Sequence, residues 1–296
     1  MNRVVVVTRT KDRSVLLARA LDSVLAQTFT DWTHVIVNDG GERAPVDELV
    51  AARRARYGER VRVVHHATSL GMEAASNAGL RAAEGELAVI HDDDDSWSPE
   101  FLQACVEWLD AHAAANVAGV ITHAVRIDED IEGDQIVRPQ RTPYNNWMPA
   151  VTLWRMAASN SFPPISFLFR RAILDEVGWF REDLPVLGDW DFHLRVLTRY
   201  EIGLIPRELA NYHFRRDATS AYSNTVTGAV DRHHHYDALL RNELLRKDLS
   251  AGRFGLGVLV NLAKQLDELQ RAVDRNSAFS YVKDKVYNLA KRAKLL

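Results

Sequence analysis

The sequence predicts an α/β fold with a doubly wound, mostly parallel central sheet. Short apolar or β-branched runs alternate with segments of helical periodicity over the first hundred residues, which is the pattern of successive strand and helix units. The first run, residues 4–7, is four consecutive valines and is too continuously apolar for an exposed strand. It indicates a central parallel strand that is covered on both faces.

The elements of the first half follow from these patterns in order. A polar loop over residues 8–13 follows the first strand, and the apolar positions after it have helical spacing. We expect a helix over 14–26, a strand over 34–37, a helix over 46–57, a strand over 61–65, a helix over 72–83 and a strand over 87–90.

The second half is less regular. We expect a strand or hairpin over 117–128 with 136–137, an irregular loop over 139–164, a strand over 165–170, helices over 172–177 and 192–200, and a helical pattern from about 230. The loop contains Tyr144, Trp147 and Trp154, which either offer apolar faces to an acceptor or fill a local core.

Composition narrows the class of protein. The chain has 296 residues, 47% of them hydrophobic and 26% charged, as in a soluble globular protein, and its net charge of −3 does not favour nucleic acid as a partner. Its first apolar run is too short for a secretory signal, and its later ones are too short to span a membrane. The single cysteine, Cys105, is expected in the core of a protein from a reducing cytoplasm.

Four consecutive aspartates, residues 92–95, follow the strand at 87–90. Adjacent carboxylates repel one another and need a counter-charge when buried, so the run indicates a divalent cation site; the alternative is a solvated acidic turn before the next helix. Alternation along a strand lets Asp92 and Asp94 converge while Asp93 points elsewhere, in a D-x-D arrangement. Trp97 stands where an EF-hand loop needs glycine, which excludes that motif.

No glycine-rich phosphate loop follows the first strand, because neither G-x-G-x-x-G nor G-x-x-x-x-G-K-[ST] occurs there. A dinucleotide-dependent oxidoreductase and a P-loop enzyme are therefore disfavoured. Any diphosphate that binds must be neutralised by metal and basic side chains instead.

Several motifs in this order resemble the family 2 glycosyltransferases of the GT-A fold, over roughly residues 3–220. They are T-K-D-R-(x)3-L-(x)3-L-D-S-V-L-A-Q-T at 10–28, V-N-D-G-G at 37–41, G-M-E-A-A-S-N-A-G at 71–79, the aspartate run, and G-D-W-D-F-H-L-R at 188–195. The resemblance implies a Rossmann-like, mostly parallel sheet flanked by helices. It also implies a metal-dependent inverting transfer of a sugar from a nucleoside diphosphate to a hydroxyl group.

The resemblance assigns roles to particular residues. Donor-binding roles fall on Thr10, Lys11, Arg13, Asp39, Asn77, Gly79, Asp92, Asp93, Arg215 and Arg216, and Mg²⁺ or Mn²⁺ would be held by Asp92, Asp94, Asp95 and His213. Asp39 could accept the imide N–H of uracil or thymine, which favours UDP or dTDP. Asp189 is expected to be the catalytic base, with Asp191 as the alternative; otherwise either residue is a helix cap.

The sequence also departs from the family pattern. Lys11 replaces a tyrosine that is common in relatives, Ser76 replaces an arginine, and Gly188 replaces the glutamate of an E-D pair. His213 and Arg215 occur in the opposite order to the usual one, so either could reach the metal and diphosphate.

We expect a GT-A domain over residues 1–225, with a nucleotide half at about 1–117 and an acceptor half at about 118–225, followed by a C-terminal helical extension over 226–296. Residues 281–296 form a basic amphipathic pattern that suits an anionic membrane surface, a partner helix in a homodimer or a solvated tail.

The predicted enzyme is cytoplasmic or peripheral at the inner membrane face, and acts on a saccharide or lipid-linked acceptor in cell-surface polysaccharide synthesis. Its rivals are a sugar-phosphate nucleotidyltransferase and a non-catalytic carbohydrate-binding protein with a degenerate site.

Overall fold

The computed structural model describes residues 2–132, 135–215, 230–276 and 285. It divides into two compact units: one contains Met1–Leu153 and Asn160–Ala238, and the other contains Trp154–Ser159 and Leu239–Leu296. The predicted boundary near residue 225 lies outside the described residues and stays a prediction.

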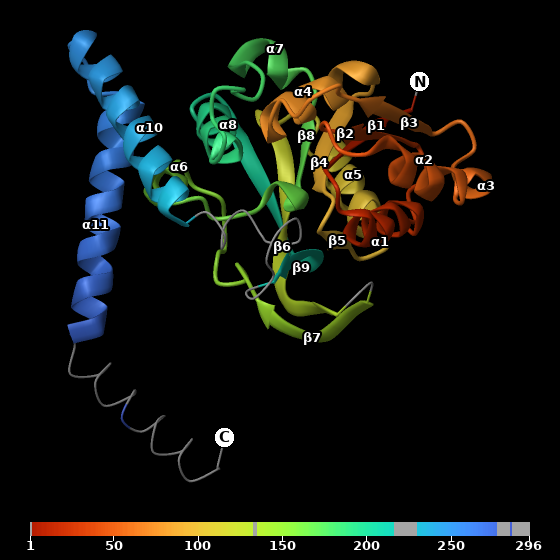
Figure 1. Ribbon diagram of the computed structural model, residues 1–296. Coiled ribbons are helices and arrows are strands. Elements are labelled where there is room, and N and C mark those ends of the chain that lie inside the picture. The colour runs from red at the N-terminus through yellow and green to blue at the C-terminus, as the bar shows by residue number, and fades with distance from the viewer. Residues whose placement is uncertain (1, 133–134, 216–229, 277–284, 286–296) are drawn as a thin grey trace. The chain divides into compact units, whose positions relative to one another are not determined.

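The first unit is built on one mixed sheet whose strands lie in the order β3-β2-β1-β4-β8-β6-β9-β5, with β7 paired to β6 (Figure 1). The strands are β1 (Val4–Thr10), β2 (Trp32–Asn38), β3 (Val61–His65), β4 (Leu87–Asp92), β5 (Ser96–Trp97), β6 (Val117–Glu132), β7 (Gln135–Pro143), β8 (Phe167–Arg170) and β9 (Glu201–Phe214). The neighbours β3, β2, β1 and β4 are parallel, whereas β8 is antiparallel to both β4 and β6. The predicted α/β class is confirmed.

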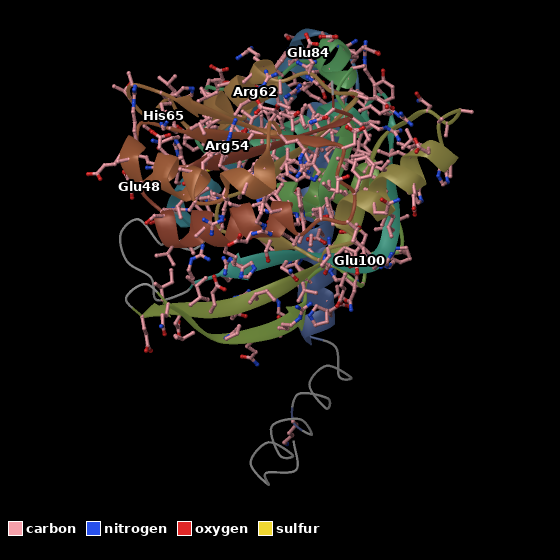
Figure 2. All side chains as sticks on the ribbon, turned by 90° about the vertical axis from the view of Figure 1, so that its right-hand side faces the viewer. Glu48, Arg54, Arg62, His65, Glu84 and Glu100 are labelled. Carbon is pink, nitrogen blue, oxygen red and sulfur yellow. The ribbon has the colours of Figure 1, made fainter. Side chains whose placement is uncertain are left out.

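Helices connect and cover these strands. They are α1 (Ser14–Leu25), α2 (Arg43–Ala51), α3 (Arg54–Tyr57), α4 (Met72–Ala82), α5 (Phe101–Ala111), α6 (Leu153–Ala158), α7 (Ile173–Val177), α8 (Gly188–Leu197), α10 (Val230–Ser250) and α11 (Leu256–Asn276). A 3₁₀ turn, Pro164–Ser166, precedes β8. Charged side chains on these helices or next to them, such as Glu48, Arg54 and Glu84, are exposed to solvent (Figure 2).

The strand β1 is covered on both faces, as its four valines predict. Val4 and Val6 belong to a buried cluster that includes Leu17 of α1 and Leu102 of α5. The helix α4 covers the opposite face (Figure 1). A Cβ on Gly79 of α4 would lie 2.3 Å from Val7 Cγ1. A side chain at Gly79 would therefore force α4 away from the sheet.

Several expected boundaries differ from the structure. The predicted loop 139–164 instead contains the end of β7 and the helix α6, and the predicted strand at 165 begins at Phe167 after the 3₁₀ turn. The helix expected from 192 begins four residues earlier, at Gly188. Local periodicity sets the type of an element better than its ends, because tertiary pairing and capping decide where it stops.

The second unit is helical. Buried Arg241 of α10 donates to the carbonyl oxygens of Ala157 (3.0 Å) and Ala158 (2.9 Å), the last residues of α6. Asp248 accepts from the backbone N–H groups of Gly255 and Val258 at the start of α11. These bonds satisfy backbone groups that a helix leaves free at its ends. Within the described residues, no helix has the length and apolarity needed to cross a bilayer.

Candidate active site

The carboxyl ends of β1, β2 and β4 meet at one edge of the sheet. Thr10 is the register partner of Asn38, and Arg9 is the register partner of Asp92. Thr10 Oγ1 donates to Asp93 Oδ2 at 2.6 Å, and the N–H of Asp39 donates to the Thr10 carbonyl at 2.9 Å. The structure therefore brings the predicted donor-site residues of three separate segments together, as expected for a parallel sheet.

Arginines supply the counter-charge for the aspartate run. Arg9 Nε lies 2.7 Å from Asp92 Oδ1, and Arg13 Nη1 lies 3.3 Å from Asp93 Oδ1 and 3.5 Å from Asp94 Oδ2. Arg215 also pairs with Asp94. Burial raises the pKa of Asp93 to about 6, although Arg13 opposes the shift. The like-charge repulsion inferred from the sequence is thus relieved largely by guanidinium groups.

Asp95 is fully buried and is held differently from its neighbours. Its Oδ1 accepts the backbone N–H of His213 at 2.9 Å, and its Oδ2 has no hydrogen-bond partner among the described residues. Burial raises the pKa of this carboxyl well above its usual range, and Asp94 adds repulsion. An unpartnered buried carboxylate oxygen needs either a proton or a cation.

Glu129 of β6 is the centre of a buried charge cluster that sequence reasoning missed. It accepts from Arg19 at 2.7 and 2.9 Å, from Arg215 at 2.9 Å and from His213 Nδ1 at 2.7 Å. Burial alone would raise the pKa of Glu129, but the bonds from His213 and Arg19 outweigh it and bring the pKa to about 2. Within an acidic, alternating segment nothing in the sequence distinguishes Glu129 from its neighbours.

The protonation of His213 follows from its partners. Burial lowers the pKa of His213, so the ring is neutral at pH 7. Because a carboxylate only accepts hydrogen bonds, Nδ1 carries the proton toward Glu129, and Nε2 accepts from Ser96 Oγ at 2.9 Å. A histidine with one nitrogen held by a carboxylate and the other deprotonated has the form that binds metals.

Asp39 binds the segment after β3. Oδ1 accepts from His66 Nδ1 and the Leu70 N–H, both at 2.8 Å, and Oδ2 accepts from Ser69 Oγ at 2.7 Å and the Gly71 N–H at 3.0 Å. Burial opposes ionisation, but the hydrogen bonds lower the pKa below its usual value. All four lone-pair positions are in use, so a nucleobase contact would replace or share one of these bonds.

Two other predicted donor-site residues are packed inside the fold. Asn77 is buried and donates to the Phe180 carbonyl at 2.9 Å and to Glu182 Oε1 at 2.8 Å, which ties α4 to the segment before α8. Gly79 faces β1, as described above. Lys11 is exposed in the loop after β1. Contacts of these residues with a donor stay predictions, and Arg216 and residues 281–296 lie outside the described residues apart from Lys285.

Asp189 and Asp191 of α8 have different environments. Asp191 is buried against Arg195, whose Nε donates to Oδ2 at 2.8 Å, and Arg195 in turn binds backbone carbonyls before α8. Asp189 is partly exposed, and its Oδ2 accepts from Asn160 Nδ2 at 2.7 Å. Neither residue is the N-cap, because Leu187 holds that position. Burial raises the pKa of Asp189, against the hydrogen bond from Asn160.

The residues of the aspartate run suit a hard cation in ligand type. Carboxylate oxygens are the ligands that Mg²⁺ and Mn²⁺ prefer, and Asp95 has an oxygen without a partner. No group of three histidine, cysteine, aspartate or glutamate side chains is placed to hold a metal within the described ranges. Because Mg²⁺ commonly uses one or two carboxylates together with substrate phosphates, a complete protein cage is not required.

The acidic residues lie at the carboxyl ends of the parallel strands, which is where open α/β sheets bind their ligands. The sequence matches the family described as Glycosyl transferase family 2 over residues 4–178. The chain belongs to this glycosyltransferase family, and the predicted resemblance is confirmed.

Individual relatives agree with this assignment. The uncharacterized glycosyltransferase YwdF of Bacillus subtilis is 27% identical over 215 residues, which are 72% of this chain and 74% of YwdF. A PGL/p-HBAD biosynthesis glycosyltransferase of Mycobacterium bovis is 25% identical over 194 residues, 63% of this chain and 69% of the relative. The crystal structure of S. aureus TarS 1–349 in complex with UDP-GlcNAc shares the fold, with a TM-score of 0.59 and 20% identity. That match covers 74% of this chain and 60% of the TarS chain.

Proposed function

We propose that this glycosyltransferase moves a sugar from a nucleoside diphosphate to an acceptor hydroxyl by metal-dependent, inverting, single-step displacement. One observation carries the proposal: the two acidic centres, about a hundred residues apart in the chain, lie within electrostatic range of one another. Arg9 forms an ion pair with Asp92 at 2.7 Å, the negative charge of Asp189 also acts on Arg9, and the charge of Asp92 adds to the burial that raises the pKa of Asp189. A donor at one centre would therefore present its anomeric carbon near a base at the other.

Asp189 is the proposed base. Hydrogen bonds from the Asn160 side chain and the Trp190 backbone N–H orient its carboxylate, and the lone pairs that these bonds leave could take the proton of the attacking hydroxyl. The raised pKa makes it a stronger proton acceptor than an ordinary aspartate. Asp191 is less suited because Arg195 binds its carboxylate.

Arg13 and Arg215 are the proposed phosphate contacts, because both lie at the aspartate run and guanidinium groups bind phosphate oxygens well. Mg²⁺ or Mn²⁺ would be held by Asp94, with Asp92, Asp95 and His213 as the other candidate ligands. When bound, the ion would offset the charge that develops on the departing diphosphate.

The donor and acceptor are proposed from the chemistry of Asp39 and from the related proteins. TarS has been crystallised with UDP and with UDP-GlcNAc, and Asp39 has the chemistry to accept a uracil or thymine imide, so we propose UDP or dTDP as the nucleotide. A saccharide or lipid-linked acceptor in cell-surface polysaccharide synthesis is consistent with the biosynthetic name of the mycobacterial relative. From the sequence pattern we also propose a cytoplasmic location, with peripheral membrane contact or dimerisation through residues 281–296.

Calorimetric titration with UDP, dTDP, GDP, ADP and CMP, in Mn²⁺ and in EDTA, tests the donor site. We expect one diphosphate to bind tightly only with metal, and Asp94→Asn to abolish this while Asp175→Asn, at an exposed position of α7, leaves it unchanged.

In Asp189→Asn, nucleotide binding should persist while turnover falls by about 10²–10⁴-fold. Metal-dependent binding without any turnover would favour the carbohydrate-binding alternative, and no binding to any nucleotide would refute the donor site.

A further inference from the structure

Glu73 is a buried carboxylate at the site, within the motif at 71–79, to which the sequence assigned no role. It lies in the first turn of α4, is 3% exposed, and its Oε2 is 3.5 Å from Arg9 Nη1. Burial raises its pKa to about 7 despite the opposing charge of Arg9, and Asp189, Asp92 and Asp191 add repulsion. A buried carboxylate needs a compensating charge, which the Arg9 guanidinium supplies here.

The side chain of Glu73 occupies the space beside the first residue of α8. A Cβ added to Gly188 would lie 2.5 Å from Cγ, Cδ and Oε1 of Glu73. Any side chain at position 188 would therefore force the Glu73 side chain to shift. Gly188 is also the position at which this sequence lacks the glutamate expected before Asp189. A carboxylate is thus present next to Asp189, but it comes from α4.

Arg9 makes a similarly close contact with Ser76 of α4. Its Nη1 donates to Ser76 Oγ at 2.9 Å and to the Met72 carbonyl at 3.3 Å, while its Nε donates to Asp92. Ser76 is the position at which the sequence lacks the expected arginine. Ser76 and Gly188, the two positions that depart from the family pattern, therefore both lie beside the Arg9–Glu73 ion pair. This pair supplies one positive and one negative charge, as the expected arginine and glutamate would have done.

We propose that Glu73 and Arg9 form a positioning pair that links Asp92 at the donor centre to the first turn of α8, which carries Asp189. Glu73 fills the space that Gly188 leaves and holds Arg9, and Arg9 holds Asp92. The contacts of the pair described here are with Asp92, Ser76 and the space beside Gly188, so its proposed role is to keep the two acidic centres in register. This inference rests on the proposed function, because the two centres need alignment only if they act on one substrate.

The test removes the carboxylate from α4 and places one at the first residue of α8. We expect Glu73→Ala to lower kcat at least about tenfold, because a small misplacement of reacting groups is costly, and Gly188→Glu alone to do the same through the collision with Glu73. The double variant Glu73→Ala/Gly188→Glu should recover kcat to within about threefold of wild type, with donor KM changing less than kcat. Glu84→Ala, at an exposed glutamate just after α4 (Figure 2), is the matched control and should match wild type.

A charge-free double variant separates positioning from packing. Glu73→Ala/Gly188→Ala fills part of the same space without a carboxylate, so it should stay as impaired as Glu73→Ala. Equal recovery in both double variants, or no recovery in the carboxylate variant, would overturn the positioning role. Thermal unfolding of the four combinations of Glu73→Ala and Gly188→Ala measures the Glu73–Gly188 contact independently of turnover, and additive shifts in Tm would overturn that contact, which links the pair to α8 in the proposal. A wild type without activity toward any donor would instead refute the proposed function.

Discussion

Replacing Glu129 should destabilise the first unit severely, because this residue neutralises a buried cluster. The carboxylate is 1% exposed and accepts hydrogen bonds from Arg19, His213 and Arg215, and the side chain of Arg215 is fully buried. Glu129→Ala leaves Arg215 with Asp94 as its remaining ionic partner among those described above. Removing one member of a buried ion pair costs about 3–5 kcal/mol, since the other charge stays desolvated.

The expected change in Tm follows from this free energy. A domain of this size loses about 2–4 °C for each kcal/mol, so Glu129→Ala should lower Tm on the order of 10 °C. Circular dichroism or differential scanning calorimetry would measure the shift. The matched control is Glu59→Ala, which removes the exposed partner of Arg54 and should leave Tm unchanged. Equal Tm values for the two variants would refute the buried-cluster argument.

The same cluster predicts a pH dependence of stability. The folded-state pKa of Glu129 is about 2, below an unfolded value of about 4.3, so the unfolded chain binds the proton more readily. The stabilisation is therefore complete above the unfolded pKa and is lost as the pH falls through 4 toward 2. Glu129→Gln should show a shallower loss of Tm over this window than wild type, and parallel curves would contradict the prediction.

Three further predictions follow from the site. The raised pKa of Asp189 means that kcat/KM should rise with pH through a pKa above the usual aspartate value, as the base ionises, and a profile without this limb would argue against Asp189. Asp191→Asn should lower Tm, because Arg195 loses its ionic partner, yet leave turnover largely intact; a loss of turnover with unchanged Tm would exchange the roles of the two aspartates. Asp39→Ala should speed amide hydrogen exchange at Leu70 and Gly71, whose N–H groups it accepts, and unchanged exchange would show that this segment is held by other contacts.

The fold class and the location of the acidic residues could be derived from the sequence. Continuous β-branched runs, such as Val4–Val7, require cover on both faces, and alternating helices supply it. Parallel strands then bring their carboxyl ends to one edge, which is why Thr10, Asp39 and Asp92 could be placed together without coordinates. The need for counter-charge at the aspartate run also followed from like-charge repulsion alone.

Only the tertiary structure decided which groups meet these carboxylates. Arg9 and Glu73 are 64 residues apart, and Arg215 and Asp94 are 121 residues apart, so no local periodicity relates them. The roles of Asp189 and Asp191 were ambiguous for a similar reason: both lie in the first turn of α8, and only the packing of Asn160 and Arg195 distinguishes them. The spacing of residues along the chain predicts the type and order of the elements, whereas the partner of a side chain depends on sheet register and helix docking, which the folded chain alone establishes.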